Sequence, residues 1–134
     1  MEGSCLCGRV TVEVPGRPDY LNACNCAACM KLGTLWGYFP VGEVRIEGSP
    51  ARYVREDIAQ PHLGFDFCGQ CGTAIDWAPI GDGMPDRMGV NMRLFDPAAL
   101  RGIEVRYGDR RNHSTNPRHY YREPNPFDGA GAIA

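Results

Sequence analysis

The sequence predicts a mostly β protein that is built from small sheets of short strands and contains one short helix. Its 134 residues suit a single domain. The 17 glycines and 11 prolines indicate frequent turns rather than long helices. Apolar and polar residues also alternate over many short stretches, and this period of two is typical of half-buried strands.

The first half of the chain contains several predicted strands. Residues 8–14 begin the series, because Val10, Val12 and Val14 alternate with polar neighbours. The other predicted strands of this half cover residues 20–24, 34–41, 43–48 and 51–56. Glycine, proline and charged residues between several of them indicate turns, so the strands are expected to form small sheets.

The second half continues the same pattern. Its predicted strands cover residues 63–68, 72–78, 87–95 and 103–108. The first two flank a Cys-x-x-Cys turn. In the third, Val90 and Met92 are two positions apart and are therefore expected on one face of the strand.

Residues 96–102 carry the one strong helix signal. Asp96 is a favourable N-cap, Pro97 suits the first helical position, and Gly102 is a typical stop. The sequence therefore predicts its short helix at this point.

No linker or internal repeat divides the chain, so we expect one domain over residues 1–124 and a flexible tail over residues 125–134. The segment MEGSCLCGRV lacks the basic start and apolar centre of a signal peptide. No run of about 18 apolar residues is present to span a membrane. We expect a cytoplasmic protein, and there clustered cysteines usually bind metal or take part in catalysis.

The seven cysteines fall into three groups with the spacing of metal ligands. They are Cys5 and Cys7, then Cys24, Cys26 and Cys29, then Cys68 and Cys71. Thiolates favour a soft metal in tetrahedral geometry, which means zinc first. The two pairs supply four ligands, as in a closed structural site, whereas the central trio leaves one position open, as in a catalytic site. Up to two zinc ions per chain are expected.

Alternatives to this partition remain open. Both zinc sites are structural if His62, His113 or His119 completes the second one. Iron is chemically allowed at the four-cysteine site, and a cysteine cluster without metal is the remaining alternative.

Several residues around the trio also have two interpretations. Lys31 either lowers the pKa of a thiolate or meets a substrate carboxylate, or it is simply a solvated lysine. Trp36, Tyr38 and Phe39 are expected in the core, with the wall of a pocket as the alternative.

The order of these motifs resembles the glutathione-dependent formaldehyde-activating enzyme family, which includes centromere protein V. The resemblance rests on the stretches GSCLCGRV, CNCAACMKLG, FCGQCGT and VNMRLFDP, covers roughly residues 3 to 100, and includes all seven cysteines. The chain has Asn25 and Met30 where the family commonly has histidine and arginine.

The resemblance implies a β-tent fold, in which small sheets are pinned by a structural zinc. It assigns that zinc to Cys5, Cys7, Cys68 and Cys71, and a catalytic zinc to Cys24, Cys26 and Cys29. The implied activity is the condensation of formaldehyde with glutathione to S-hydroxymethylglutathione, which is a carbon–sulfur lyase reaction in reverse.

The expected function is therefore that of a carbon–sulfur lyase-type zinc protein that binds a small thiol such as glutathione and handles its adduct with an aldehyde such as formaldehyde. A non-catalytic carrier of thiol or zinc is one alternative. A nucleic-acid adaptor is another, suggested by the centromere relative and by the arginines within residues 101–122. The net charge of -2 argues against nucleic-acid and anionic-membrane partners.

Overall fold

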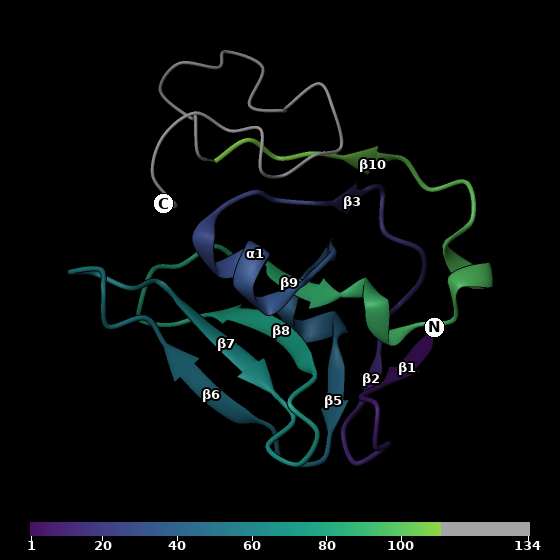
Figure 1. The fold of residues 1–134 in the computed structure, drawn as a ribbon, viewed down its shortest axis with the longest axis horizontal. Coiled ribbons are helices and arrows are strands. Elements are labelled where there is room, and N and C mark those ends of the chain that lie inside the picture. Colours follow the sequence, from purple (N-terminus) through teal and green to yellow (C-terminus); the bar gives the residue numbers. More distant parts are fainter. Residues whose placement is uncertain (111–134) are drawn as a thin grey trace.

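The computed structural model describes residues 1–110, which form two sheets joined by turns (Figure 1). The strands are β1 (Glu2–Ser4), β2 (Thr11–Glu13), β3 (Leu21–Asn22), β4 (Trp36–Phe39), β5 (Arg45–Glu47), β6 (Ala51–Val54), β7 (Leu63–Phe67), β8 (Ala74–Pro79), β9 (Met88–Asn91) and β10 (Val105–Arg106). The helix α1 covers Ala27–Leu32, and 3-10 turns cover Val41–Glu43, Met92–Leu94 and Pro97–Leu100. The mostly β fold expected from the sequence is confirmed.

The smaller sheet has three strands in the order β1-β2-β5, and the larger has seven in the order β10-β3-β4-β9-β8-β7-β6. Neighbouring strands are antiparallel except β10 and β3, which pair in parallel and lie side by side in Figure 1. This pairing brings the last described segment back to the strand that precedes the central cysteines. In the β7–β8 hairpin the register shifts between Asp66 and Phe67, just before the Cys-x-x-Cys turn.

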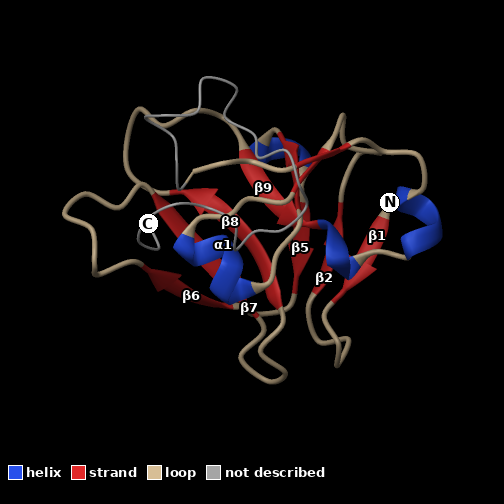
Figure 2. Ribbon diagram, turned by 45° about the horizontal axis from the view of Figure 1, so that its top comes forward, coloured by secondary structure: helices blue, strands red, loops and turns tan. Residues whose placement is uncertain are grey.

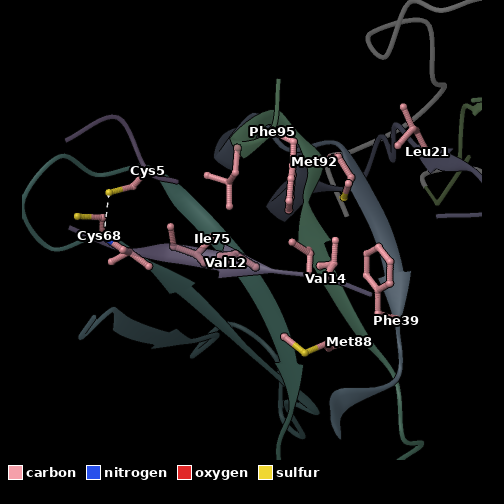
Figure 3. Close-up of a cluster of buried hydrophobic side chains, with 13 residues drawn as sticks. Cys5, Val12, Val14, Leu21, Phe39, Cys68, Ile75, Met88, Met92 and Phe95 are labelled. Atoms are coloured by element: carbon pink, nitrogen blue, oxygen red, sulfur yellow. Dashed lines mark hydrogen bonds between the residues drawn. The ribbon is translucent and has the colours of Figure 1, made fainter. Parts of the chain in front are cut away.

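The main core lies where side chains of the two sheets meet (Figure 3). Val10, Val12 and Val14 are all buried, so the predicted alternation around β2 is confirmed. They meet Val90 of the larger sheet and Met92 of the 3-10 turn that follows β9. Both are buried, but the predicted strand over residues 87–95 ends at Asn91, so Met92 does not share a strand face with Val90. The burial of these aliphatic side chains is the main favourable contribution to folding.

A second, smaller cluster lies beneath α1 and contains Trp36, Phe65 and Cys29. Strand β4 divides its side chains between the two clusters, because successive residues point to opposite faces. Phe39 belongs to the main core, whereas Trp36 and Tyr38 contact the second cluster. Figure 2 shows α1 lying across the strands of the larger sheet.

The structure corrects the predicted position of the helix. Residues 96–102 form only a 3-10 turn, although Asp96 caps it by accepting from the Ala98 N–H at 2.8 Å. The α-helix of the described region is α1, for which we predicted no helix. Its signal was inconspicuous because the N-cap is Cys26 rather than serine, threonine, aspartate or asparagine.

The first strand, β1, is a further element that the sequence analysis did not assign. The predicted strands are otherwise found, with shorter bounds at most positions. The expected domain end at residue 124 and the tail over 125–134 lie outside the described residues. Within residues 1–110 no helix is long and apolar enough to cross a membrane.

Candidate metal centres

The four-cysteine cluster joins two turns that are distant in the sequence. Cys5 and Cys7 lie in the turn after β1, and Cys68 and Cys71 lie in the turn between β7 and β8. Their sulfur atoms all lie within 4.8 Å of one another. Figure 3 shows Cys5 and Cys68 facing each other at one end of the main core. The fold thus brings together the four sulfurs that the spacing grouped, and their role as metal ligands stays a prediction.

The spacing of these sulfurs fits a tetrahedral metal. The Cys7 sulfur lies 3.6 Å from that of Cys5 and 3.7 Å from that of Cys68. Four sulfurs at about 2.3 Å from a zinc ion would be about 3.8 Å apart. Hydrogen bonding from Thr73, whose hydroxyl lies 3.2 Å from the Cys71 sulfur, lowers the pKa of Cys71 to about 5 and favours its thiolate form.

The three-cysteine cluster is built from one short stretch of chain. Cys24 follows β3, Cys26 is the N-cap of α1, and Cys29 lies three residues later in the helix. An N-cap residue and the third helical residue lie on the same side of the first turn, so their sulfurs converge. The three sulfur atoms lie within 4.8 Å of one another.

Each sulfur of this trio accepts one N–H hydrogen bond. The Cys26 backbone donates to Cys24 at 3.4 Å, the Cys29 backbone donates to Cys26 at 3.5 Å, and the Trp36 indole donates to Cys29 at 3.1 Å. Such donors stabilise thiolates. Hydrogen bonds from the Cys24 and Cys29 thiols lower the pKa of Cys26, so Cys26 is the first of the three to deprotonate.

Trp36 therefore has a role that the sequence analysis did not find. It was expected in the core, and it is indeed 1% exposed, but its indole N–H also holds a cysteine sulfur. No signal in the sequence pointed to this contact, because it requires α1 to pack against β4 in the folded chain.

The trio opens onto a cavity of about 430 Å³. Its lining includes the aromatic side chains of Trp36, Tyr38, Phe65 and Trp77. Arg55, His62 and Arg110 also line it. A cavity of this size and composition is typical of small-molecule sites.

The fourth position of the trio is not taken by a described histidine. His62 lines the cavity, but among residues 1–110 the only ligand atoms within 4.8 Å of one another at this site are the three sulfurs. The other two candidates, His113 and His119, lie outside the described residues.

Lys31 and Asn25 are two further residues near the trio, and they have different surroundings. Lys31 lines a smaller neighbouring cavity of about 200 Å³ together with Arg55 and Asp57. Asn25 is buried, donates to the Asp109 carboxylate at 2.9 Å and accepts from the Arg110 N–H at 2.8 Å. Asn25 thus anchors the segment after β10 beside the cysteines.

A buried carboxyl pair lies in the β7–β8 hairpin, where Asp66 is opposite Asp76. Arg52 binds Asp66 through two hydrogen bonds of 2.7 and 2.8 Å. Asp76 is 1% exposed, and neither of its oxygens has a hydrogen-bond partner within the described chain. Burial and the neighbouring Asp66 charge raise the pKa of Asp76 to about 7.

Comparison with known proteins matches the chain to a family model and to solved structures. A family model described as "Glutathione-dependent formaldehyde-activating enzyme" matches residues 1–107. A crystal structure of a Rhodobacter sphaeroides protein is similar with a TM-score of 0.62 and 22% identity, over 78% of this chain and 99% of that chain. No curated protein matches the chain. The structural match shows a shared fold, and the family model spans both cysteine clusters.

Proposed function

Because the chain belongs to the glutathione-dependent formaldehyde-activating enzyme family, we propose that it binds a small thiol such as glutathione at the cluster of Cys24, Cys26 and Cys29. At this site it joins the thiol to an aldehyde such as formaldehyde, or cleaves the resulting adduct. The first cluster, Cys5, Cys7, Cys68 and Cys71, holds a structural zinc.

The main support for this proposal is that the first cluster offers four sulfur ligands, whereas the trio offers three and leaves one coordination position open. Three sulfurs face a cavity of about 430 Å³, and the part of the chain described here adds no fourth ligand. When bound by these sulfurs, zinc would act as a Lewis acid that lowers the pKa of an incoming thiol. The N–H donors to all three sulfurs support thiolate ligands at this place.

The residues of the chain supply binding and orientation. The aromatic side chains give the reacting sulfur a largely apolar environment. Arg55, held by Asp57 at 2.7 and 2.9 Å, places a cation in the cavity wall for a carboxylate of a glutathione-like thiol. In the forward reaction the thiolate sulfur forms a bond to the aldehyde carbon, and overall one proton passes from sulfur to oxygen. The reverse reaction breaks the same carbon–sulfur bond.

Cobalt substitution tests this proposal. Thiolate ligation changes the cobalt–sulfur absorption, so the cobalt protein is titrated with glutathione, with cysteine and with a glutathione analogue that lacks the thiol. We expect a spectral response to at least one thiol and none to the analogue. A spectrum that already shows four protein ligands at both sites, unchanged by any thiol, would refute the proposal.

Turnover separates an enzyme from a carrier. The protein is mixed with S-hydroxymethylglutathione, and the release of formaldehyde is followed with time. Catalysed release identifies a lyase-type enzyme, whereas a cobalt response without turnover identifies a carrier.

A further inference from the structure

Tyr38 lies in the wall of the same cavity as Cys24 and Cys29, and its ring is held from several sides. The rings of Tyr20 and Trp77 lie 5.6 and 6.0 Å from it, between centroids. The guanidinium of Arg87 lies 3.9 Å from its ring centre. These contacts restrict the ring, so the Tyr38 hydroxyl has a fixed position.

The direction of the hydrogen bond at this hydroxyl follows from Asn22. The Gly108 backbone N–H donates to the Asn22 side-chain oxygen at 3.2 Å, and a backbone N–H can only donate. The amide nitrogen of Asn22 must therefore face Tyr38, where it donates to the hydroxyl oxygen at 2.5 Å. A Cβ at Gly108 would lie 2.6 Å from that amide oxygen, so glycine permits this approach.

The Tyr38 oxygen thus accepts one hydrogen bond, and its own proton remains available to donate. Within residues 1–110 no other group is hydrogen-bonded to this hydroxyl. Burial raises the pKa of Tyr38 to about 12, so the group remains a protonated donor at neutral pH. A neutral donor held beside the cysteine trio has no structural acceptor in the described chain.

From this arrangement we propose that Tyr38 is a catalytic residue, whose hydroxyl donates a hydrogen bond to the oxygen of the aldehyde and to the same oxygen in the thiol adduct. Asn22 is a positioning residue that directs the Tyr38 proton toward the cavity. This inference rests on the proposed function, since it requires an aldehyde carbon beside the trio.

The Tyr38 hydrogen bond contributes most to catalysis as negative charge develops on the aldehyde oxygen. When the thiolate forms the carbon–sulfur bond, the π electrons of the carbonyl move to its oxygen. The Tyr38 hydrogen bond strengthens on that developing alkoxide, which stabilises the transition state more than the free aldehyde. The alkoxide then takes a proton from water, in place of the proton that the thiol lost on binding, and Tyr38 keeps its own. Cleavage follows the same steps backward.

The first test compares Tyr38→Phe with Tyr20→Phe. Both remove one hydroxyl from the same aromatic stack, but the Tyr20 hydroxyl accepts from Arg87 at 3.2 Å, and Tyr20 does not line the cavity of the trio. We expect Tyr38→Phe to lower kcat with S-hydroxymethylglutathione roughly a hundredfold, with the cobalt response to glutathione unchanged. Tyr20→Phe should retain both. Equal rates in the two variants would overturn the inference.

A second test reverses the hydrogen bond without removing the hydroxyl. In Asn22→Asp the side chain can only accept, so it binds both the Gly108 N–H and the Tyr38 proton. We expect a loss of kcat comparable to that of Tyr38→Phe. A cobalt response to glutathione that persists in this variant shows that the new charge has not simply repelled the thiol. Full activity in Asn22→Asp would overturn the role of the Tyr38 proton.

A third test reads binding rather than turnover. S-acetylglutathione carries a carbonyl oxygen on the carbon next to sulfur, and S-ethylglutathione lacks it. Wild-type protein should bind the acetyl compound about tenfold more tightly and shift its carbonyl stretch to lower frequency, and Tyr38→Phe should lose both effects. If glutathione alters the cobalt spectrum but this preference is absent, the inference fails alone. If no thiol alters the spectrum, the proposed function fails as well.

Discussion

The two cysteine clusters use the same ligand atom and differ in how the chain supplies it. The first cluster takes its sulfurs from two turns, and its Cys7 and Cys68 are separated by 61 positions. The second takes all its sulfurs from the short segment between Cys24 and Cys29. Closing a long loop removes more conformational entropy from the unfolded chain than closing a short one. This difference supports our proposal that the first cluster contributes to stability and the second to chemistry.

The two clusters also differ in what surrounds their sulfur atoms. Cys5 and Cys68 belong to the main core, whereas the trio faces an aromatic cavity. When metal ligands lie in the core, loss of the metal also disturbs the packing of the core. When they lie beside a cavity, a small molecule can reach the metal. The following predictions test this division, from the largest expected effect to the smallest.

Loss of one ligand should affect the two clusters unequally. Cys68→Ser is expected to lower the free energy of unfolding by about 4 kcal/mol or more, because it breaks a cross-link between distant segments. Cys5→Ser should behave similarly. Cys26→Ser should cost about 1 kcal/mol but abolish the cobalt response to thiols. Denaturant unfolding of the three variants measures this, and equal losses would make the second cluster structural.

Metal removal should proceed in two steps. The trio offers three ligands and an open side, so its zinc should leave first, with an apparent affinity about a hundredfold lower, which corresponds to about 2.7 kcal/mol. Only the second step should unfold the protein. Metal analysis and circular dichroism during chelator titration test the order. Release of both ions in one step would contradict it.

The stability of the β7–β8 hairpin, which carries two cysteines of the first cluster, and thiol binding at the trio should respond to pH in opposite directions. The pKa of Asp76 is raised from 3.8 to about 7 in the folded protein. Its protonated form contributes stability that is complete below about pH 4 and is lost as pH rises through about 7. Thiol binding at the trio releases a proton and should instead strengthen as pH rises toward about 8.5.

Asp76→Asn isolates the first of these effects. The amide is uncharged at every pH and can donate to Asp66, so the variant should be more stable than wild type at pH 8 by about 2 kcal/mol. The pH dependence of unfolding between 4 and 7 should flatten. An unchanged dependence would show that Asp76 is not the titrating group.

The smallest expected effect concerns the indole that holds the Cys29 sulfur. Trp36→Phe removes the N–H donor and should weaken metal binding at the trio about tenfold, with the first cluster unaffected. Trp77→Phe is the matched control, because Trp77 lines the same cavity and has no hydrogen bond to a sulfur within the described chain. Competition with a chromophoric chelator compares the two variants. Equal metal affinities of the two variants would show that the Trp36 indole does not support metal binding at the trio.

The sequence by itself determined those features that depend on near neighbours. Alternation predicted that Val10, Val12 and Val14 are buried, because residues two apart share a face of a strand. Spacing and coordination number predicted how the seven cysteines divide into a set of four and a set of three, and the sulfurs gather in those two sets. The helix α1 was also locally encoded, but a cysteine N-cap concealed it.

Only the tertiary structure decided which side chains surround the trio. The Trp36 indole reaches Cys29 because α1 packs against β4. The Asn22 amide nitrogen donates to Tyr38 because the segment after β10 places Gly108 against the Asn22 oxygen. These contacts join residues from different elements of the fold. Their geometry follows from strand order and register, which depend on pairing between distant segments and carry no local signal.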